Sequence, residues 1–185
     1  KNPGNISKHL NYFKGTKILE DQEFCDKYMG QCPVIAITLK DVSGDDFKDA
    51  YFKLAEVVAG VAAKFEFLMG SPKLNAKEKA KFDKISDEDY LKSFAKKPKS
   101  YLTSAISSLS LMLYKHFNKQ VYVLIDEYDV PLAKAQSYGY HKDMVTLMSS
   151  FLGFLKDSQK DPETNKPVVK KVILTGCLKV AKNSI

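Results

Sequence analysis

The sequence contains no arginine and no tryptophan, and all 29 of its basic residues are lysines, which give a formal net charge of +7. A chain without arginine cannot supply the bidentate guanidinium fork or the arginine finger that many phosphate sites use. Many of the lysines lie between Lys73 and Lys99, where acidic residues are interspersed. This mixture favours a solvated surface over a nucleic-acid footprint.

Long apolar runs and paired cysteines are also missing. No hydrophobic stretch approaches the roughly 18–20 residues of a membrane-spanning helix, so we expect no membrane partner. The three cysteines, Cys25, Cys32 and Cys177, show no C-x-x-C spacing, which predicts a reducing, cytoplasmic location. The sequence begins without Met or an apolar leader and stops at Ile185 without a recognisable ending, so we expect it to be an internal piece of a longer protein.

Three short apolar runs rich in β-branched residues are predicted to be strands, near residues 33–39, 121–126 and 171–176. The segments between them are long enough to contain helices, which implies right-handed crossovers and a parallel sheet with helices on both faces. With 44% hydrophobic residues, the 185-residue chain can form one sizeable core. We therefore predict a single α/β domain over residues 1–185.

Apolar residues at helical spacing predict the intervening helices. The longest predicted helices cover residues 47–69, 100–118 and 142–156, and short helical pieces are expected within residues 1–31. The polar segment 73–99 is predicted to form one or two short exposed helices and to be a helical insertion in the domain.

The most informative feature is the run from Val121 to Asp129, in which five apolar residues are followed by acids. Ligands of open α/β sheets bind beyond the carboxyl ends of the strands, where Asp126 and Glu127 would lie. An apolar strand followed by Asp-Glu is the Walker B pattern of P-loop nucleotide hydrolases, in which the Asp holds Mg²⁺ and the Glu orients the attacking water. The alternative is that the two acids merely end a strand.

The partner of that pattern, the phosphate-binding motif G-x-x-x-x-G-K-[ST], does not occur in the 185 residues. The backbone of that motif cradles the nucleotide phosphates, and its lysine reaches the terminal ones. We therefore expect these residues alone to bind ATP weakly and to turn it over negligibly.

Further candidate residues lie near the same predicted edge of the sheet. Thr175 ends the third strand and either senses the γ-phosphate or bonds to the backbone as a strand-terminal hydroxyl. Asp129 is either an outer ligand of the metal or the N-cap of the next helix. Lys179 and Lys182 follow the third strand, where they either approach phosphates or remain on the surface.

Three segments resemble one known family, the AAA-ATPase-like proteins. Residues 123–132 contain that family's LIDEYDxP signature, residues 174–185 are similar to its TG-x-x-[RK]-x-x-K-x-SI stretch, and residues 24–35 resemble the lead-in to its second strand. The resemblance spans nearly the whole chain. It implies a partial domain with strand order 5-1-4-3-2, in which the three strands present are the second, third and fourth.

The resemblance also implies what lies outside these residues. Family members carry the first strand and the Walker A lysine upstream of the segment that corresponds to Lys1, and many carry a PD-(D/E)XK nuclease-like domain downstream. A missing first strand would leave the fourth strand with an uncovered edge, which invites self-association or a protein partner. Nucleic acid is a partner by this analogy alone. Lys179 stands where the family often has arginine, and a lysine can neutralise phosphate charge but cannot form a fork.

The sequence thus predicts a P-loop-type ATPase core that hydrolyses Mg²⁺-ATP in the intact protein. Asp126 would hold the metal, Glu127 would activate water, Thr175 would sense the γ-phosphate, and Asp129 and Lys179 would assist nucleotide binding. A non-catalytic interaction module, in which the acids are only strand-end caps, is the alternative. A metal-dependent nuclease using Asp126 and Glu127 is a weaker hypothesis, because no Asp/Glu-x-Lys strand accompanies them.

Overall fold

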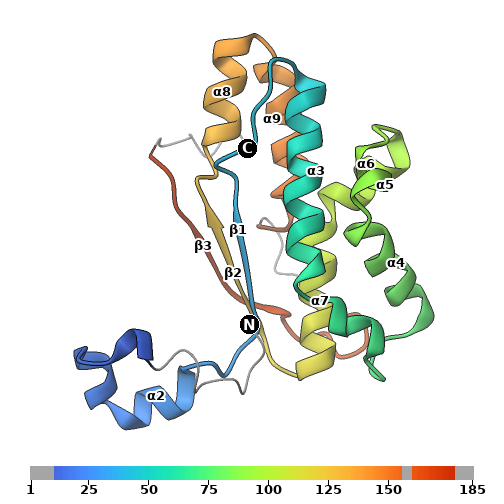
Figure 1. Cartoon of the computed structure of the whole chain (residues 1–185). Helices are drawn as coiled ribbons and strands as arrows, with labels where there is room; N and C mark the ends of the chain where they lie inside the picture. The colour runs from blue at the N-terminus through green and yellow to red at the C-terminus, as the bar shows by residue number, and fades with distance from the viewer. Residues whose placement is uncertain (1–10, 156–159, 178–185) are drawn as a thin grey trace.

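The computed structural model describes residues 11–155 and 160–177, and these form an α/β fold around a parallel sheet (Figure 1). The strands are β1 (Val34–Thr38), β2 (Val121–Asp126) and β3 (Val169–Leu174), and their order in the sheet is β1-β2-β3. The predicted strands are all present, with the third beginning at Val169 instead of residue 171. Their order agrees with the neighbour relations expected of a second, third and fourth strand.

The described residues contain helices of very different length. They are α2 (Gln22–Tyr28), α3 (Phe47–Ala63), α4 (Ala76–Ser86), α5 (Glu88–Lys92), α6 (Lys96–Thr103), α7 (Ala105–Phe117), α8 (Val130–Tyr138) and α9 (His141–Phe151), with 3₁₀ turns at Asn11–Phe13, Lys17–Glu20, Glu66–Gly70 and Gly153–Leu155. In the part of the chain that the structure covers, no helix is both long and apolar enough to cross a membrane.

Helix α3 begins where the sequence offers a cap. The Asp46 side chain accepts a hydrogen bond from the Asp49 amide at 2.9 Å, which satisfies one of the free donors of the first turn. The helix then buries an apolar face that includes Leu54 and Val58. It ends at Ala63 instead of near residue 69, and the remaining residues form the separate 3₁₀ turn Glu66–Gly70.

The segment predicted to be exposed between residues 73 and 99 is partly buried. Helix α4 starts with a capping box between Asn75 and Glu78 and buries Phe82 and Ile85 in the common core. Pro98 lies in the first turn of α6, where its missing amide hydrogen costs no helical bond. The description of this segment as an insertion stays a prediction.

Helices of the described chain cover one face of the sheet and leave the other uncovered. Figure 1 shows α3, α7 and α9 on the same side of the strands. On the opposite face, the side chains of Leu124 and Ile173 are 36% and 42% exposed. We expected helices on both faces, but both connections run in the same direction across the sheet, and right-handed crossovers of one direction lie on one face.

Candidate functional site

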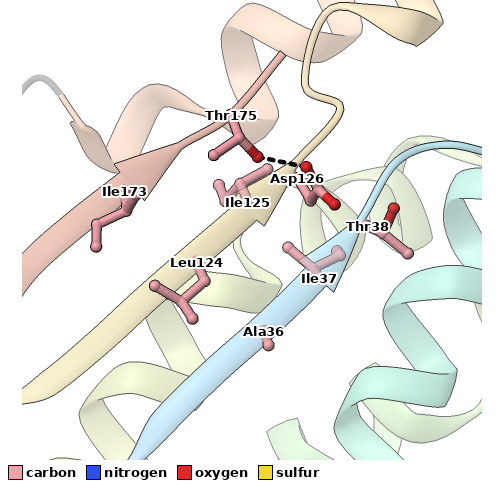
Figure 2. A pocket seen from close by; sticks show the side chains of 8 residues that line it. All are labelled: Ala36, Ile37, Thr38, Leu124, Ile125, Asp126, Ile173 and Thr175. Atoms are coloured by element: carbon pink, nitrogen blue, oxygen red, sulfur yellow. Dashed lines mark hydrogen bonds between the residues drawn. The ribbon is translucent and has the colours of Figure 1, made fainter. Parts of the chain in front are cut away.

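The carboxyl ends of the three strands bring three polar side chains together (Figure 2). Thr38 of β1 is in register with Asp126 of β2, and Thr175 directly follows β3. The backbone ladder continues past the strands, since the Thr175 amide donates to the Ile125 carbonyl at 2.9 Å and the Leu39 amide donates to the Asp126 carbonyl at 2.9 Å. The positions of these side chains are therefore fixed by sheet hydrogen bonds.

The carboxylate of Asp126 is held by two donors. Its Oδ1 accepts a hydrogen bond from the Thr175 hydroxyl, drawn in Figure 2, and a second from the Glu127 amide at 3.0 Å. Asp126 and Thr175 are both exposed at the end of the sheet. The contact joins two candidates that are far apart in the sequence, and it identifies a hydroxyl–carboxylate pair at the predicted edge.

Glu127 has an unusual backbone conformation. Its φ of +53° lies in the left-handed region, which non-glycine residues adopt uncommonly and at an energetic cost. The sharp turn is supported by the Tyr128 amide, which donates to the Thr175 carbonyl at 3.2 Å, and by the Val130 amide, which donates to the Glu127 carbonyl at 3.2 Å. Strained residues of this kind cluster at active sites and ligand clamps.

Asp129 is buried, with 3% of its surface exposed, at the N-cap position of α8. Its side chain makes no capping hydrogen bond to that helix. Instead, Oδ2 accepts a hydrogen bond from the Cys177 amide at 3.1 Å. Asp129 thus occupies the N-cap position, but its carboxylate contacts the segment that follows β3 instead of capping the helix.

A pocket of about 570 Å³ lies against the uncovered face of the sheet, and Figure 2 shows its lining. Its polar rim consists of Thr38, Asp126 and Thr175, and its apolar lining consists of Ala36, Ile37, Leu124, Ile125 and Ile173. Sequence reasoning missed Thr38. The available signal was that Thr38, like Thr175, is a hydroxyl residue near the end of an apolar run.

The donor atoms at this edge suit a hard cation. Carboxylate and hydroxyl oxygens are ligands of the kind that Mg²⁺ accepts, and Mg²⁺ usually keeps several waters and needs few protein carboxylates. Within residues 11–155 and 160–177, no group of three or more His, Cys, Asp or Glu side chains could hold a metal ion by itself. The donor set at this edge is therefore of the kind that a Mg²⁺ ion accepts while it keeps most of its waters. Lys179 and Lys182 lie outside the described residues.

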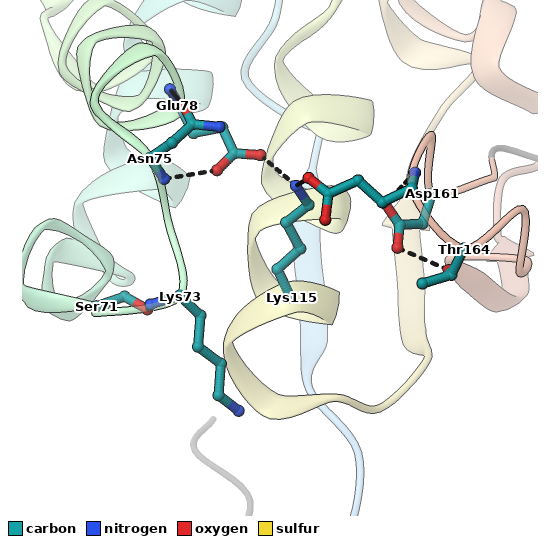
Figure 3. Close-up of polar contacts among 8 residues, drawn as sticks. Ser71, Lys73, Asn75, Glu78, Lys115, Asp161 and Thr164 are labelled. Atoms are coloured by element: carbon teal, nitrogen blue, oxygen red, sulfur yellow. Dashed lines mark hydrogen bonds and ion pairs between the residues drawn. The ribbon is translucent and has the colours of Figure 1, made fainter.

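A second polar cluster connects α4, α7 and the loop before β3 (Figure 3). Lys115 forms ion pairs with Glu78 and Glu163, each at 2.9 Å, and its side chain is only 13% exposed. These hydrogen bonds, first to Glu163 and then to Glu78, raise the pKa of Lys115 to about 12. Lys115 lies near the end of α7, just before β2, and Glu163 lies in the loop before β3, so the cluster is near the amino ends of these strands and Asp126 is at the carboxyl end of β2. Its paired charges join α4 and α7 to the loop.

A comparison with known protein families gives one match. The chain matches a family model described as Predicted AAA-ATPase over residues 5–185. No curated protein and no solved structure is detectably similar to it. The family match covers nearly the whole chain, including all three strands and the residues at their carboxyl ends. The chain therefore belongs to the predicted AAA-ATPase family.

Proposed function

We propose that this domain binds and hydrolyses Mg²⁺-ATP in the intact protein, and that β2 with the turn after it is its Walker B segment. The observation that carries the proposal is the hydrogen-bonded pair of Asp126 and Thr175 at the carboxyl edge of a parallel sheet, with Glu127 next to it. Ligands of such sheets bind at this edge. Bound Mg²⁺ would neutralise charge on the transferred phosphoryl group.

Each residue at the edge has a distinct role in this proposal. Asp126 holds the hydrated metal, and its two hydrogen bonds orient the carboxylate before the substrate arrives. Glu127 accepts the proton of the attacking water and orients that water toward the phosphorus. The Thr175 hydroxyl, which donates to Asp126, senses the γ-phosphate in this proposal. We further propose that Lys179 neutralises phosphate charge and that Asp129 assists nucleotide binding indirectly, as an outer ligand of the metal.

The phosphate-cradling loop has to come from outside the printed sequence, which lacks G-x-x-x-x-G-K-[ST]. We therefore propose that these residues are part of a longer ATPase. The 185 residues alone should bind ATP weakly and hydrolyse it negligibly, because neither the backbone donors nor the Walker A lysine is available to the phosphates.

The test is Glu127→Gln in a protein that includes the upstream motif. We expect ATP to remain bound while hydrolysis falls by roughly 100-fold or more, since a positioned general base contributes on that order. Glu88→Gln, a change at the first residue of α5, is the matched control and should leave the rate unchanged. An unchanged rate in Glu127→Gln would refute the assignment of Glu127.

A second candidate function is a non-catalytic interaction module, which the exposed apolar face favours. Leu124 and Ile173 contribute to that face, and β3 is an edge of the described sheet where another chain can pair. In this case Asp126 and Glu127 serve only to end β2. Nucleotide retention that does not differ between wild type and Glu127→Gln would support the module over the enzyme.

A further inference from the structure

The buried carboxylate of Asp129 joins the turn after β2 to the segment after β3. Its Oδ2 accepts the Cys177 amide hydrogen at 3.1 Å, across 48 positions of the chain. A hydrogen bond to a charged group is stronger than one between neutral groups, and it is costly to lose where the carboxylate is buried. Asp129 therefore holds two segments together that the sheet ladder itself does not connect beyond Thr175.

The neighbouring glycine shows how closely the carboxylate is seated. A Cβ atom added at Gly176 would lie 2.3 Å from Oδ1 and 2.9 Å from Cγ of Asp129. It would also lie 3.0 Å from Cδ1 of Tyr128. The backbone of residue 176 thus rests directly against the Asp129 side chain, and only glycine permits this contact.

Helix α8 does not need this carboxylate in order to begin. The Leu132 and Ala133 amides donate to the Asp129 carbonyl, at 3.1 and 3.0 Å, so the backbone oxygen already starts the helix. Pro131 in the first turn has no amide hydrogen to offer to a cap. The carboxylate of Asp129 instead contacts residues 176 and 177.

These contacts fix Thr175 from both sides. Its amide donates to Ile125 and its carbonyl accepts from Tyr128, while the next two residues rest on Asp129. We propose that Asp129 is a positioning residue, which holds residues 175–177 against the turn after β2 and so aims the Thr175 hydroxyl at Asp126. The consequence for hydrolysis rests on the proposed ATPase function, but the contact itself does not.

The first experiment measures hydrogen exchange of the Cys177 amide in this chain by NMR. In Asp129→Ala the amide should exchange roughly 10-fold faster or more, because one charge-assisted hydrogen bond is lost. Asp161→Ala is the matched control: Asp161 is also 3% exposed and accepts hydrogen bonds from the Thr164 hydroxyl at 2.7 Å and the Glu163 amide at 3.3 Å. It should leave the Cys177 amide unchanged.

An unchanged Cys177 exchange rate in Asp129→Ala would overturn the proposal. If that variant does not fold, Asp129→Asn keeps the size of the side chain while weakening the bond, and the same comparison applies. Gly176→Ala provides an independent check, because its Cβ must displace the carboxylate and should also speed exchange at Cys177.

The second experiment measures kinetics in a protein that includes the upstream motif. Asp129→Asn should lower kcat for ATP by roughly 10-fold while KM changes little, since the residue acts through Thr175 and not on the nucleotide. In a Thr175→Val background, Asp129→Asn should have no further effect. If Asp129→Asn lowers kcat by the same factor in the Thr175→Val background as in wild type, Asp129 does not act through Thr175. If Glu127→Gln has no effect on nucleotide, the proposed function fails, and the exchange experiment still decides whether Asp129 holds this segment.

Discussion

Replacing Glu127 with glycine should make the protein more stable, although it removes the side chain on which the proposed reaction depends. The left-handed conformation at φ +53° costs an L-residue roughly 1–2 kcal/mol. Glycine pays no such cost, but its greater freedom in the unfolded chain costs roughly 0.5–1 kcal/mol. The difference favours Glu127→Gly by about 0.7 kcal/mol, which corresponds to a Tm increase of about 2 °C in a domain of this size.

Urea denaturation measures this difference, and two variants serve as controls. Glu127→Gln keeps the Cβ atom and the backbone strain, so its unfolding free energy should stay within about 0.5 kcal/mol of wild type. Asn118→Gly changes another left-handed residue, at φ +54°, at the end of α7. Its gain should be smaller, because asparagine tolerates this conformation better than glutamate.

A Glu127→Gly protein that is less stable than Glu127→Gln would refute the predicted gain. Contacts of the carboxyl side chain would then outweigh the strain of the backbone. If the predicted gain is found, the turn after β2 stores strain that folding alone does not require, as is typical of functional sites.

Three further substitutions, at His116, Gly44 and Gly60, are predicted to change the free energy of unfolding. Burial and the charge of Lys73 lower the pKa of His116, so its stabilising contribution is complete above pH 6.5 and is lost as the pH falls toward the lowered value. When the pH is lowered from 7.5 to 5.5, the free energy of unfolding measured by urea denaturation should fall less in His116→Gln than in wild type, by at most about 1.4 kcal/mol per pH unit. An equal fall in the two proteins would contradict this prediction. Gly44→Ala should destabilise the protein by roughly 1–3 kcal/mol, because its Cβ would lie 2.3 Å from Cβ of Asp49 and 2.7 Å from the amide nitrogen of Ala50. Gly60→Ala, within α3 and with nothing near its added Cβ, should stabilise it by about 0.5–1 kcal/mol, and thermal melts that rank the two the other way would refute both.

The sheet and two of the site residues could be predicted because their signals are local. Apolar β-branched runs predict strands, and the carboxyl ends of parallel strands must meet at one edge. This reasoning brought Asp126 and Thr175 to the same place, where the structure joins them by a hydrogen bond. The same reasoning applies to Thr38, which also lies near the end of an apolar run but was not predicted.

Other features depend on contacts that no sequence period encodes. The Asp129 carboxylate reaches the Cys177 amide only because the folded turn and the end of β3 lie side by side, whereas the sequence suggested either an outer metal ligand or a helix cap. The sequence predicts that Leu124 and Ile173 are buried, because they lie in apolar strands, but both are exposed in the structure. Their exposure depends on the direction in which the chain crosses the sheet. The segment after Lys73 was predicted to be exposed because its average composition is polar, but it contains the buried residues Phe82 and Ile85.

The strands occupy the sheet in the same order as they occur in the chain. During synthesis, β1 and β2 leave the ribosome before β3, because the chain is made from its N-terminus. Asp126 then stands at the edge of a growing sheet without its hydroxyl donor, which arrives only with Thr175. Of these three strands, β3 is therefore the one that brings Thr175 to Asp126, and a nascent chain that has not yet added β3 lacks this hydrogen-bonded pair.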